Sequence, residues 1–124
     1  MVAPRHSVEL VLLPVLDIGA AVRFYAGLGF AVADQRDDDA TLEVPGLQLV
    51  LERVSELEAD DGRPRAELRV PLPILERAWR GDERDDRSLP GPTLAPEGVF
   101  EYRVRDPSGN RVRLLAVIPD SGSP

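Results

Sequence analysis

The chain has 124 residues, which suits one compact domain or two small modules that share a core. Its composition, 43% hydrophobic and 30% charged, is that of an ordinary globular chain, and the lack of an apolar run of roughly 18 residues excludes a membrane-spanning protein. We find no cleavage site of a secretory leader near the start of the sequence, so we expect the protein in the cytoplasm. The absence of cysteine excludes thiolate metal sites and disulfides, and the net charge of -7 disfavours a nucleic-acid partner.

The first half of the chain predicts the element order βαβββ. The segment SVELVLLPVLD is rich in strand-forming residues, and Asp17 at its end stands where an N-cap would accept a hydrogen bond from the first turn of a helix. Residues 30–35 are expected to be extended, and residues 37–54 to form a hairpin around their Pro-Gly pair. Between them, apolar residues at helical spacing predict a helix that ends at Gly29; they are Ile18, Ala21, Val22, Tyr25 and Leu28.

The second half predicts the same order again. A strand is expected at residues 66–71, a short helix at 72–81 and a hairpin at 99–117 around the turn sequence DPSGN. The segment 82–98 contains too much proline for a central strand and is expected to be irregular. Its part from Ser88 to Gly98 is interpreted as a rim or a dimer-crossing loop.

A constant offset between the halves indicates duplication. Leu13 and Val15 precede the first helix, and Leu68 and Val70 precede the second at an offset of 55 residues. We therefore expect a single α+β domain built from two βαβββ modules. Module one is predicted at about 7–54, a linker at about 55–64, module two at about 65–118 and a tail at 119–124.

Apolar and charged residues alternate in the last hairpin. Tyr102 and Val104 alternate with Glu101 and Arg103, so one face of the sheet should pack against the core and the other should carry charge. The charged face has two interpretations. It is either a functional surface or a solvated one, whose cross-strand Glu–Arg pairs would contribute about 0.2 to 1 kcal/mol each.

Two segments, LPVLDIGAAVRFYAGLGF at 13–30 and YRVRDPSGNRVRLL at 102–115, resemble the hallmark segments of the vicinal oxygen chelate superfamily. This superfamily includes glyoxalases, extradiol dioxygenases and bleomycin-resistance proteins, and the chain is most similar to the metal-free bleomycin-resistance type. The resemblance covers nearly the whole chain. It implies that the two modules curl their sheets into a concave, partly open barrel-like cup, commonly completed across a homodimer, with the ligand inside.

Metal-dependent members of the superfamily carry His or Glu at four inward positions, and the resemblance places these positions at Leu10, Val50, Arg65 and Arg113. Leucine and valine offer no lone pair, and a guanidinium stays protonated and repels a cation. We therefore expect no metal and no other cofactor. Three interpretations of Arg65 and Arg113 remain open: recognition of an anionic group in a ligand, pairing with a nearby glutamate such as Glu67 or Glu101, and simple exposure to solvent.

The same alternation along the strands predicts a polar lining for the cup. No catalytic residue is predicted, because His6, the single histidine, lies near the N-terminus and leaves Ser88 and Ser108 without a base. Together with the four positions above, the candidate ligand-binding residues are Glu43, Gln48, Glu67, Arg69, Glu101 and Arg103.

Three functions are compatible with these features. The favoured one is metal-free binding or sequestration of a small polar or cationic molecule, as in antibiotic resistance, by a homodimer that does not turn the molecule over. The alternative is an enzyme, either a glyoxalase-like lyase or isomerase, or a dioxygenase. Its metal ligands would have moved to Glu9, Glu52 or Glu67, or it would be a metal-free acid–base catalyst. A module that binds a protein partner is the third.

Overall fold

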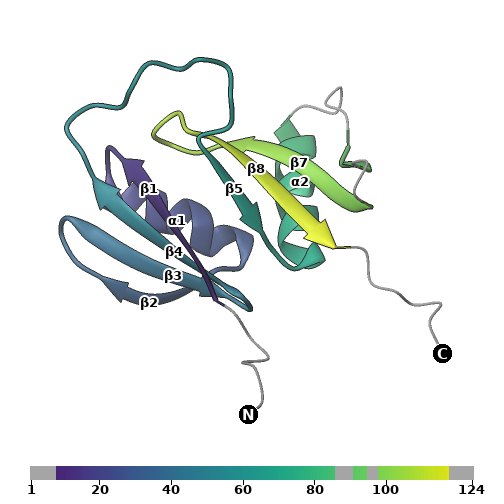
Figure 1. Ribbon diagram of the computed structural model, residues 1–124, viewed down its shortest axis with the longest axis horizontal. Coiled ribbons are helices and arrows are strands. Elements are labelled where there is room, and N and C mark those ends of the chain that lie inside the picture. Colours follow the sequence, from purple (N-terminus) through teal and green to yellow (C-terminus); the bar gives the residue numbers. More distant parts are fainter. Residues whose placement is uncertain (1–7, 86–90, 95–97, 118–124) are drawn as a thin grey trace, which may run out of the picture.

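The computed structural model describes residues 8–85, 91–94 and 98–117, and it shows two four-stranded mixed sheets with one helix packed on each (Figure 1). The first sheet has the strand order β1-β4-β3-β2, with β1 parallel to β4, and the second has the order β5-β8-β7-β6, with β5 parallel to β8. The two sheets do not close into a barrel. This α+β architecture confirms the predicted pair of βαβββ modules.

The bounds of the elements agree closely with the predicted ones in module one. Its elements are β1 (Glu9–Val15), α1 (Ile18–Leu28), β2 (Ala31–Gln35), β3 (Asp39–Val44) and β4 (Leu47–Arg53). The elements of module two are β5 (Ala66–Arg69), α2 (Leu72–Asp85), β6 (Thr93–Leu94), β7 (Val99–Arg105) and β8 (Arg111–Val117).

Helix α1 begins and ends where its capping residues predict. The Asp17 carboxylate accepts a hydrogen bond from the Ala20 backbone N–H at 3.0 Å, which satisfies one of the free donors of the first turn. Gly29 ends the helix with a φ of 117°, a conformation that a residue with a Cβ adopts only with strain. The predicted apolar stripe of this helix is buried against the first sheet.

Two predictions for module two are wrong. Helix α2 continues to Asp85 instead of ending near 81, because Gly81 keeps an ordinary helical φ and costs the helix only about 1 kcal/mol. Thr93 and Leu94 form the short edge strand β6 on β7, in a segment predicted to be irregular. An edge strand leaves one row of backbone groups unpaired, so proline next to it is tolerated. Residues 86–90 and 95–97 lie outside the described part of the chain.

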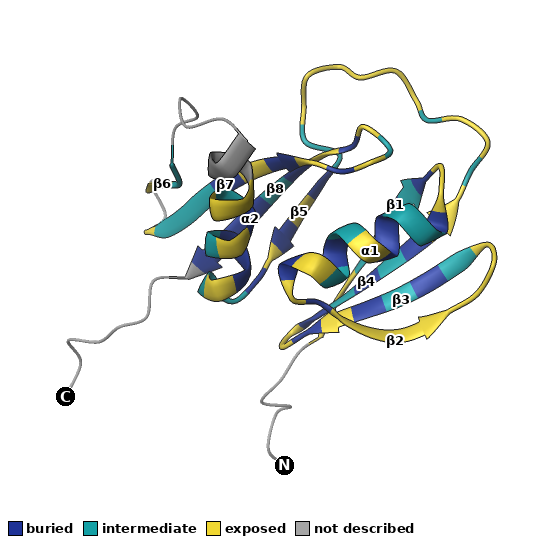
Figure 2. Ribbon diagram, turned by 180° about the vertical axis from the view of Figure 1, so that it is seen from behind, coloured by how far each residue is buried: buried dark blue, intermediate teal, exposed yellow. Residues whose placement is uncertain are grey.

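One hydrophobic core runs through both modules. Both helices lie on the same side of the two sheets, with the buried faces of the strands beneath them (Figure 2). Leu13 and Leu49 contribute to this core from the first sheet, and Leu68 and Leu114 from the second, each with no exposed surface. Neither helix in the described residues is both long and apolar enough to cross a membrane.

The DPSGN turn holds a buried polar network at the junction of the modules. Asp106 is only 4% exposed, and its Oδ1 accepts hydrogen bonds from the backbone N–H groups of Ser108 and Asn110, both at 2.9 Å. Its Oδ2 accepts from the Tyr25 hydroxyl at 2.9 Å and from the Asn110 amide at 3.0 Å. The pKa of Tyr25 is raised, mainly by burial and to a smaller extent by the charge of Asp106 and by the hydrogen bond between Tyr25 and Asp106. The phenol therefore remains protonated and donates this hydrogen bond.

Two further hydrogen bonds attach the same turn to the end of β1. The Asn110 amide donates to the carbonyl of Pro14 at 2.8 Å, and the backbone N–H of Leu16 donates to the Ser108 hydroxyl at 2.8 Å. The turn therefore fixes the position of module two relative to module one. This position determines how the two sheets meet at β1 and β5.

Candidate functional site

We define the open face as the sides of the two sheets that point away from the helices; both sides are turned toward the viewer in Figure 1. Nine of the ten predicted ligand-binding residues lie in strands at positions that alternate with buried residues, which places them on this face. Arg65 precedes β5 and is the exception. The predicted alternation is therefore correct, and the binding role of these residues stays a prediction.

The module-one half of the open face combines apolar and polar side chains. Gln48 on β4 stands opposite Leu10 on β1 and opposite Glu43 on β3, so these three predicted residues adjoin one another. Val50 stands opposite Leu12, which the sequence analysis did not single out although it continues the alternation of Leu10. Leu10 is 59% exposed and Leu12 is 58% exposed, so β1 presents an apolar edge to solvent.

The module-two half is organised around Arg113. Its Nη1 donates to Glu67 at 3.2 Å and its Nη2 donates to Glu101 at 2.9 Å, while Arg103 Nε donates to the other oxygen of Glu101 at 3.1 Å. Of the three interpretations left open for Arg113, pairing with glutamates is therefore the one observed. The hydrogen bond that Arg113 donates lowers the pKa of Glu101 to about 2. The same bond to Glu101, and then the bond to Glu67, raise the pKa of Arg113.

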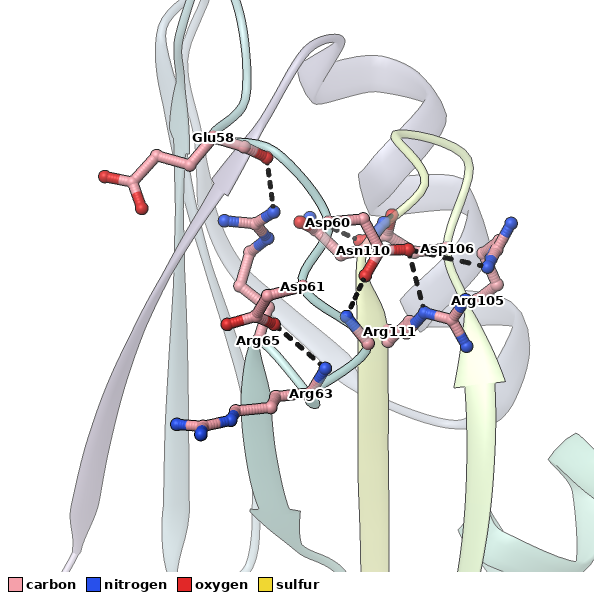
Figure 3. Close-up of polar contacts among 10 residues, drawn as sticks. Glu58, Asp60, Asp61, Arg63, Arg65, Arg105, Asp106, Asn110 and Arg111 are labelled. Atoms are coloured by element: carbon pink, nitrogen blue, oxygen red, sulfur yellow. Dashed lines mark hydrogen bonds and ion pairs between the residues drawn. The ribbon is translucent and has the colours of Figure 1, made fainter.

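Arg65 does not join this cluster. Its Nη2 donates to the carbonyl of Glu58 in the linker at 3.0 Å, and its backbone N–H donates to the carbonyl of Arg111 at 2.7 Å (Figure 3). The linker is also bound to the last hairpin through Asp60, whose Oδ2 accepts from Arg111 Nε at 2.9 Å and lies 3.8 Å from Arg105 Nη2. The hydrogen bond from Arg111 lowers the pKa of Asp60. Arg65 thus binds the linker, because it lies where the chain enters the second sheet at β5.

The residues at the four positions that the resemblance assigns to metal ligands do not fit a metal ion. Leu10 and Val50 have no donor atom, and the guanidinium of Arg113 is already bound to two carboxylates. The displaced ligands that an enzyme would need are not brought together either. Glu9 and Glu52 stand opposite Leu47 and Pro14, at the two ends of the β1–β4 pair, and Glu67 belongs to the other sheet. Within the described ranges, no three His, Asp or Glu residues are grouped to hold an ion.

A hollow of about 660 Å³ lies on the opposite side of the molecule, between the two helices. Phe24 and Leu28 of α1 and Glu76 and Arg77 of α2 are among its lining residues. It contains none of the predicted site residues. We nevertheless place the candidate site on the open face, because that face carries the ordered ion-pair network and the exposed leucines. A single sheet face forms only one wall of a binding site, so a ligand there requires a second wall.

The paired βαβββ modules give this chain the bleomycin resistance fold, which is the fold of the superfamily that its motifs resemble, the vicinal oxygen chelate superfamily. Among solved structures it is similar to a bleomycin-binding protein from Streptomyces verticillus complexed with copper(II)-bleomycin. The identity is 27% and the TM-score 0.65, with 94% of this chain and 100% of that chain covered.

Two other solved structures share the fold at lower identity. A glyoxalase/bleomycin resistance protein/dioxygenase from Alicyclobacillus acidocaldarius is 21% identical with a TM-score of 0.63, covering 92% of this chain and 93% of that one. Lactoylglutathione lyase from Agrobacterium tumefaciens is 18% identical with a TM-score of 0.59, covering 92% and 96%. No family model matches the sequence, and no curated protein matches it either.

Proposed function

We propose that this chain binds and sequesters a small polar or cationic molecule on its open face, without a metal and without turning it over. The observation that carries the proposal is the state of Arg113. Where the superfamily places an oxygen ligand, this chain has a guanidinium that is 18% exposed and ion-paired to Glu67 and Glu101. Such a group can orient a polar ligand by hydrogen bonding, whereas it repels a metal cation.

The remaining side chains of the open face support this ligand chemistry. Glu43 and Glu52 are exposed and form no ion pair among the described residues, so they are available to a cationic group. Leu10 and Leu12 offer apolar area to a flat part of the ligand. The similar protein from Streptomyces verticillus was solved with copper(II)-bleomycin, and a bleomycin-like glycopeptide is therefore the first ligand to test.

The functional unit of the proposal is a homodimer. The open face of one chain cannot enclose a ligand, and two leucines on its edge strand are more than half exposed. A second copy laid over this face would supply the missing wall and would cover apolar surface that a monomer leaves in water. The ligand would then lie between two chains.

Titration calorimetry tests the proposal with metal-free bleomycin in EDTA, with copper(II)-bleomycin in chelator-free buffer, and with a panel of other cationic antibiotics. We expect saturable heat for at least one compound and recovery of that compound unchanged. Arg113→Met should weaken binding by roughly tenfold or more, since a charge-assisted hydrogen bond is lost. Arg77→Met, on the helix side, is the matched control and should leave it unchanged. No heat from any compound, no protection of sensitive cells, or chemical conversion of the ligand would contradict the proposal.

A further inference from the structure

The hollow between the two helices is the feature of the molecule that the proposed function leaves unexplained. Its volume of about 660 Å³ lies within the range of roughly 300 to 1,000 Å³ that is typical of small-molecule sites. Both helices are turned toward the viewer in Figure 2, and the open face lies on the far side of the sheets. The hollow is therefore separate from the open face. Its lining combines apolar and charged residues, among them Phe24, Leu28, Arg77, Arg80 and Val104.

Two glycines inside the helices keep part of this hollow open. Gly27 of α1 and Gly81 of α2 both line it. Neither has a positive φ, so the backbone does not require glycine at either position. A Cβ added at either residue would meet no atom of the described chain within 4 Å, so packing does not require glycine either. Because glycine inside a helix is less stable than alanine, the fold loses stability at both positions. The missing Cβ atoms leave room for another molecule to approach both helix backbones.

The charges in the hollow favour an anionic ligand. Among the described lining residues, Arg77 and Arg80 stand against the single carboxylate of Glu76, although the whole chain has a net charge of -7. Within the part of the chain that the structure describes, neither Glu76 nor Arg77 forms an ion pair. Residues three apart on a helix are neighbours on its surface, so Arg77 and Arg80 can act on the same group. Glu76 would repel a second anionic group, so a ligand with one such group fits best.

We propose that this hollow is a second binding site, which takes a small organic molecule with one carboxylate on a flat apolar body. Arg77 and Arg80 would donate charge-assisted hydrogen bonds to the carboxylate. The apolar body would pack against the half-buried ring of Phe24 and against the helix backbones at Gly27 and Gly81. The site differs from the open face in its position and in the charge of its ligand, so the inference does not depend on the proposed function.

Titration of the isotope-labelled chain with naphthoate, followed by amide NMR, tests this site. Naphthoate carries one carboxylate on a flat aromatic body, and naphthamide is a neutral control of the same shape. With naphthoate we expect saturable shifts of the Gly27 and Gly81 backbone amides and a Kd of about 1 mM or tighter, which a ligand of this size can reach. Naphthamide should bind roughly tenfold or more weakly, because it offers no charge to the guanidiniums. This comparison needs only the wild-type chain.

Three variants identify the groups responsible. Arg77→Met should weaken naphthoate binding roughly tenfold, since it removes a charge-assisted hydrogen bond. Arg23→Met is the matched control, because Arg23 is an exposed arginine of α1 that is not among the described lining residues, and it should leave binding unchanged. Gly81→Leu occupies space in the hollow and should also weaken binding roughly tenfold. Its Tm should nevertheless rise by roughly 2 to 4 °C, because leucine is the better helix former.

Four results would overturn the assignment. The first is naphthoate that shifts neither glycine amide, or that shifts the amides of the open-face strands instead. The second is equal affinity for naphthoate and naphthamide, and the third is a folded Gly81→Leu chain that binds naphthoate as tightly as the wild type. The fourth is a shift of the same two amides on dilution of the free chain, which would mean that a second copy covers the hollow. None of these results affects the calorimetry of the open face, where Arg77→Met is expected to change nothing.

Discussion

Replacing Tyr25 by phenylalanine perturbs the junction between the modules at a single atom. The phenol is completely buried and donates to the ionised Asp106 at 2.9 Å. A hydrogen bond to a charged group contributes about 1.5 to 3 kcal/mol to the free energy of unfolding. For a chain of 124 residues, with an unfolding entropy of about 2.1 cal/mol/K per residue, this loss corresponds to a decrease in Tm of roughly 6 to 12 °C.

The pH dependence of this loss identifies the phenol as its cause. Because burial raises the pKa of Tyr25 above its ordinary value of 10.0, its contribution is fully present below pH 10 and is lost as the pH rises above 10 toward the folded-state pKa. The difference in stability between wild type and Tyr25→Phe should therefore shrink, by about 1.4 kcal/mol at pH 11. Urea unfolding followed by circular dichroism from pH 7 to 11 measures it.

A double-mutant cycle with Asp106→Asn provides the control. The two side chains should show a coupling energy of about 1 to 3 kcal/mol if the hydrogen bond acts as described. The reasoning is refuted if Tyr25→Phe changes the free energy of unfolding by less than about 0.5 kcal/mol, or if the difference from wild type stays constant between pH 10 and 11.

Three further predictions concern local features. Because Arg113 holds the pKa of Glu101 at about 2, below its ordinary value of 4.5, the stability from this carboxylate is complete above pH 4.5 and is lost as the pH falls toward 2. Acid unfolding of Glu101→Gln should be flatter in this window, and an acid profile identical to that of the wild type would contradict the ion pair. Asp17→Ala should cost about 1 kcal/mol in chemical denaturation, and no loss would mean that the cap is not formed in solution. Gly29→Ala should lower the free energy of unfolding by about 1 to 3 kcal/mol, because Gly29 has a positive φ. Gly27→Ala, at an ordinary helical φ, should raise it by about 0.5 to 1 kcal/mol. A change of the same sign in both variants would refute the backbone strain at Gly29.

The fold could be predicted from the sequence because its signals are local. Asp17 and Gly29 mark the ends of α1 by their own chemistry, and the alternation in β7 and in the first half of β8 indicates which side chains face the core. The end of α2 and the edge strand β6 could not be predicted in the same way. A glycine such as Gly81 can lie inside a helix or mark its C-terminal end, so the sequence alone does not say where α2 ends. A two-residue strand such as β6 forms only because β7 lies beside it.

The site could be predicted only in part. Alternation placed Arg113 and Glu101 on one face, but it could not show that their side chains bind each other. Arg65 was assigned to the same surface by its offset from Leu10, whereas its guanidinium is held by the linker, a contact that no periodic pattern encodes. The contact between Tyr25 and Asp106 spans 81 residues of sequence and was missed. An aromatic hydroxyl on a buried helix stripe was the signal that a polar partner was needed.

The metal content of the purified protein tests the central claim most directly. Protein prepared without chelator is dialysed and measured by plasma mass spectrometry, and the heat of ligand binding is then compared before and after EDTA. We predict far less than one zinc, nickel, manganese or iron ion per chain, and no change in the binding heat of a metal-free ligand. A stoichiometric ion that survives dialysis and disappears in Glu67→Ala would contradict the claim that this open face binds its ligand without a metal.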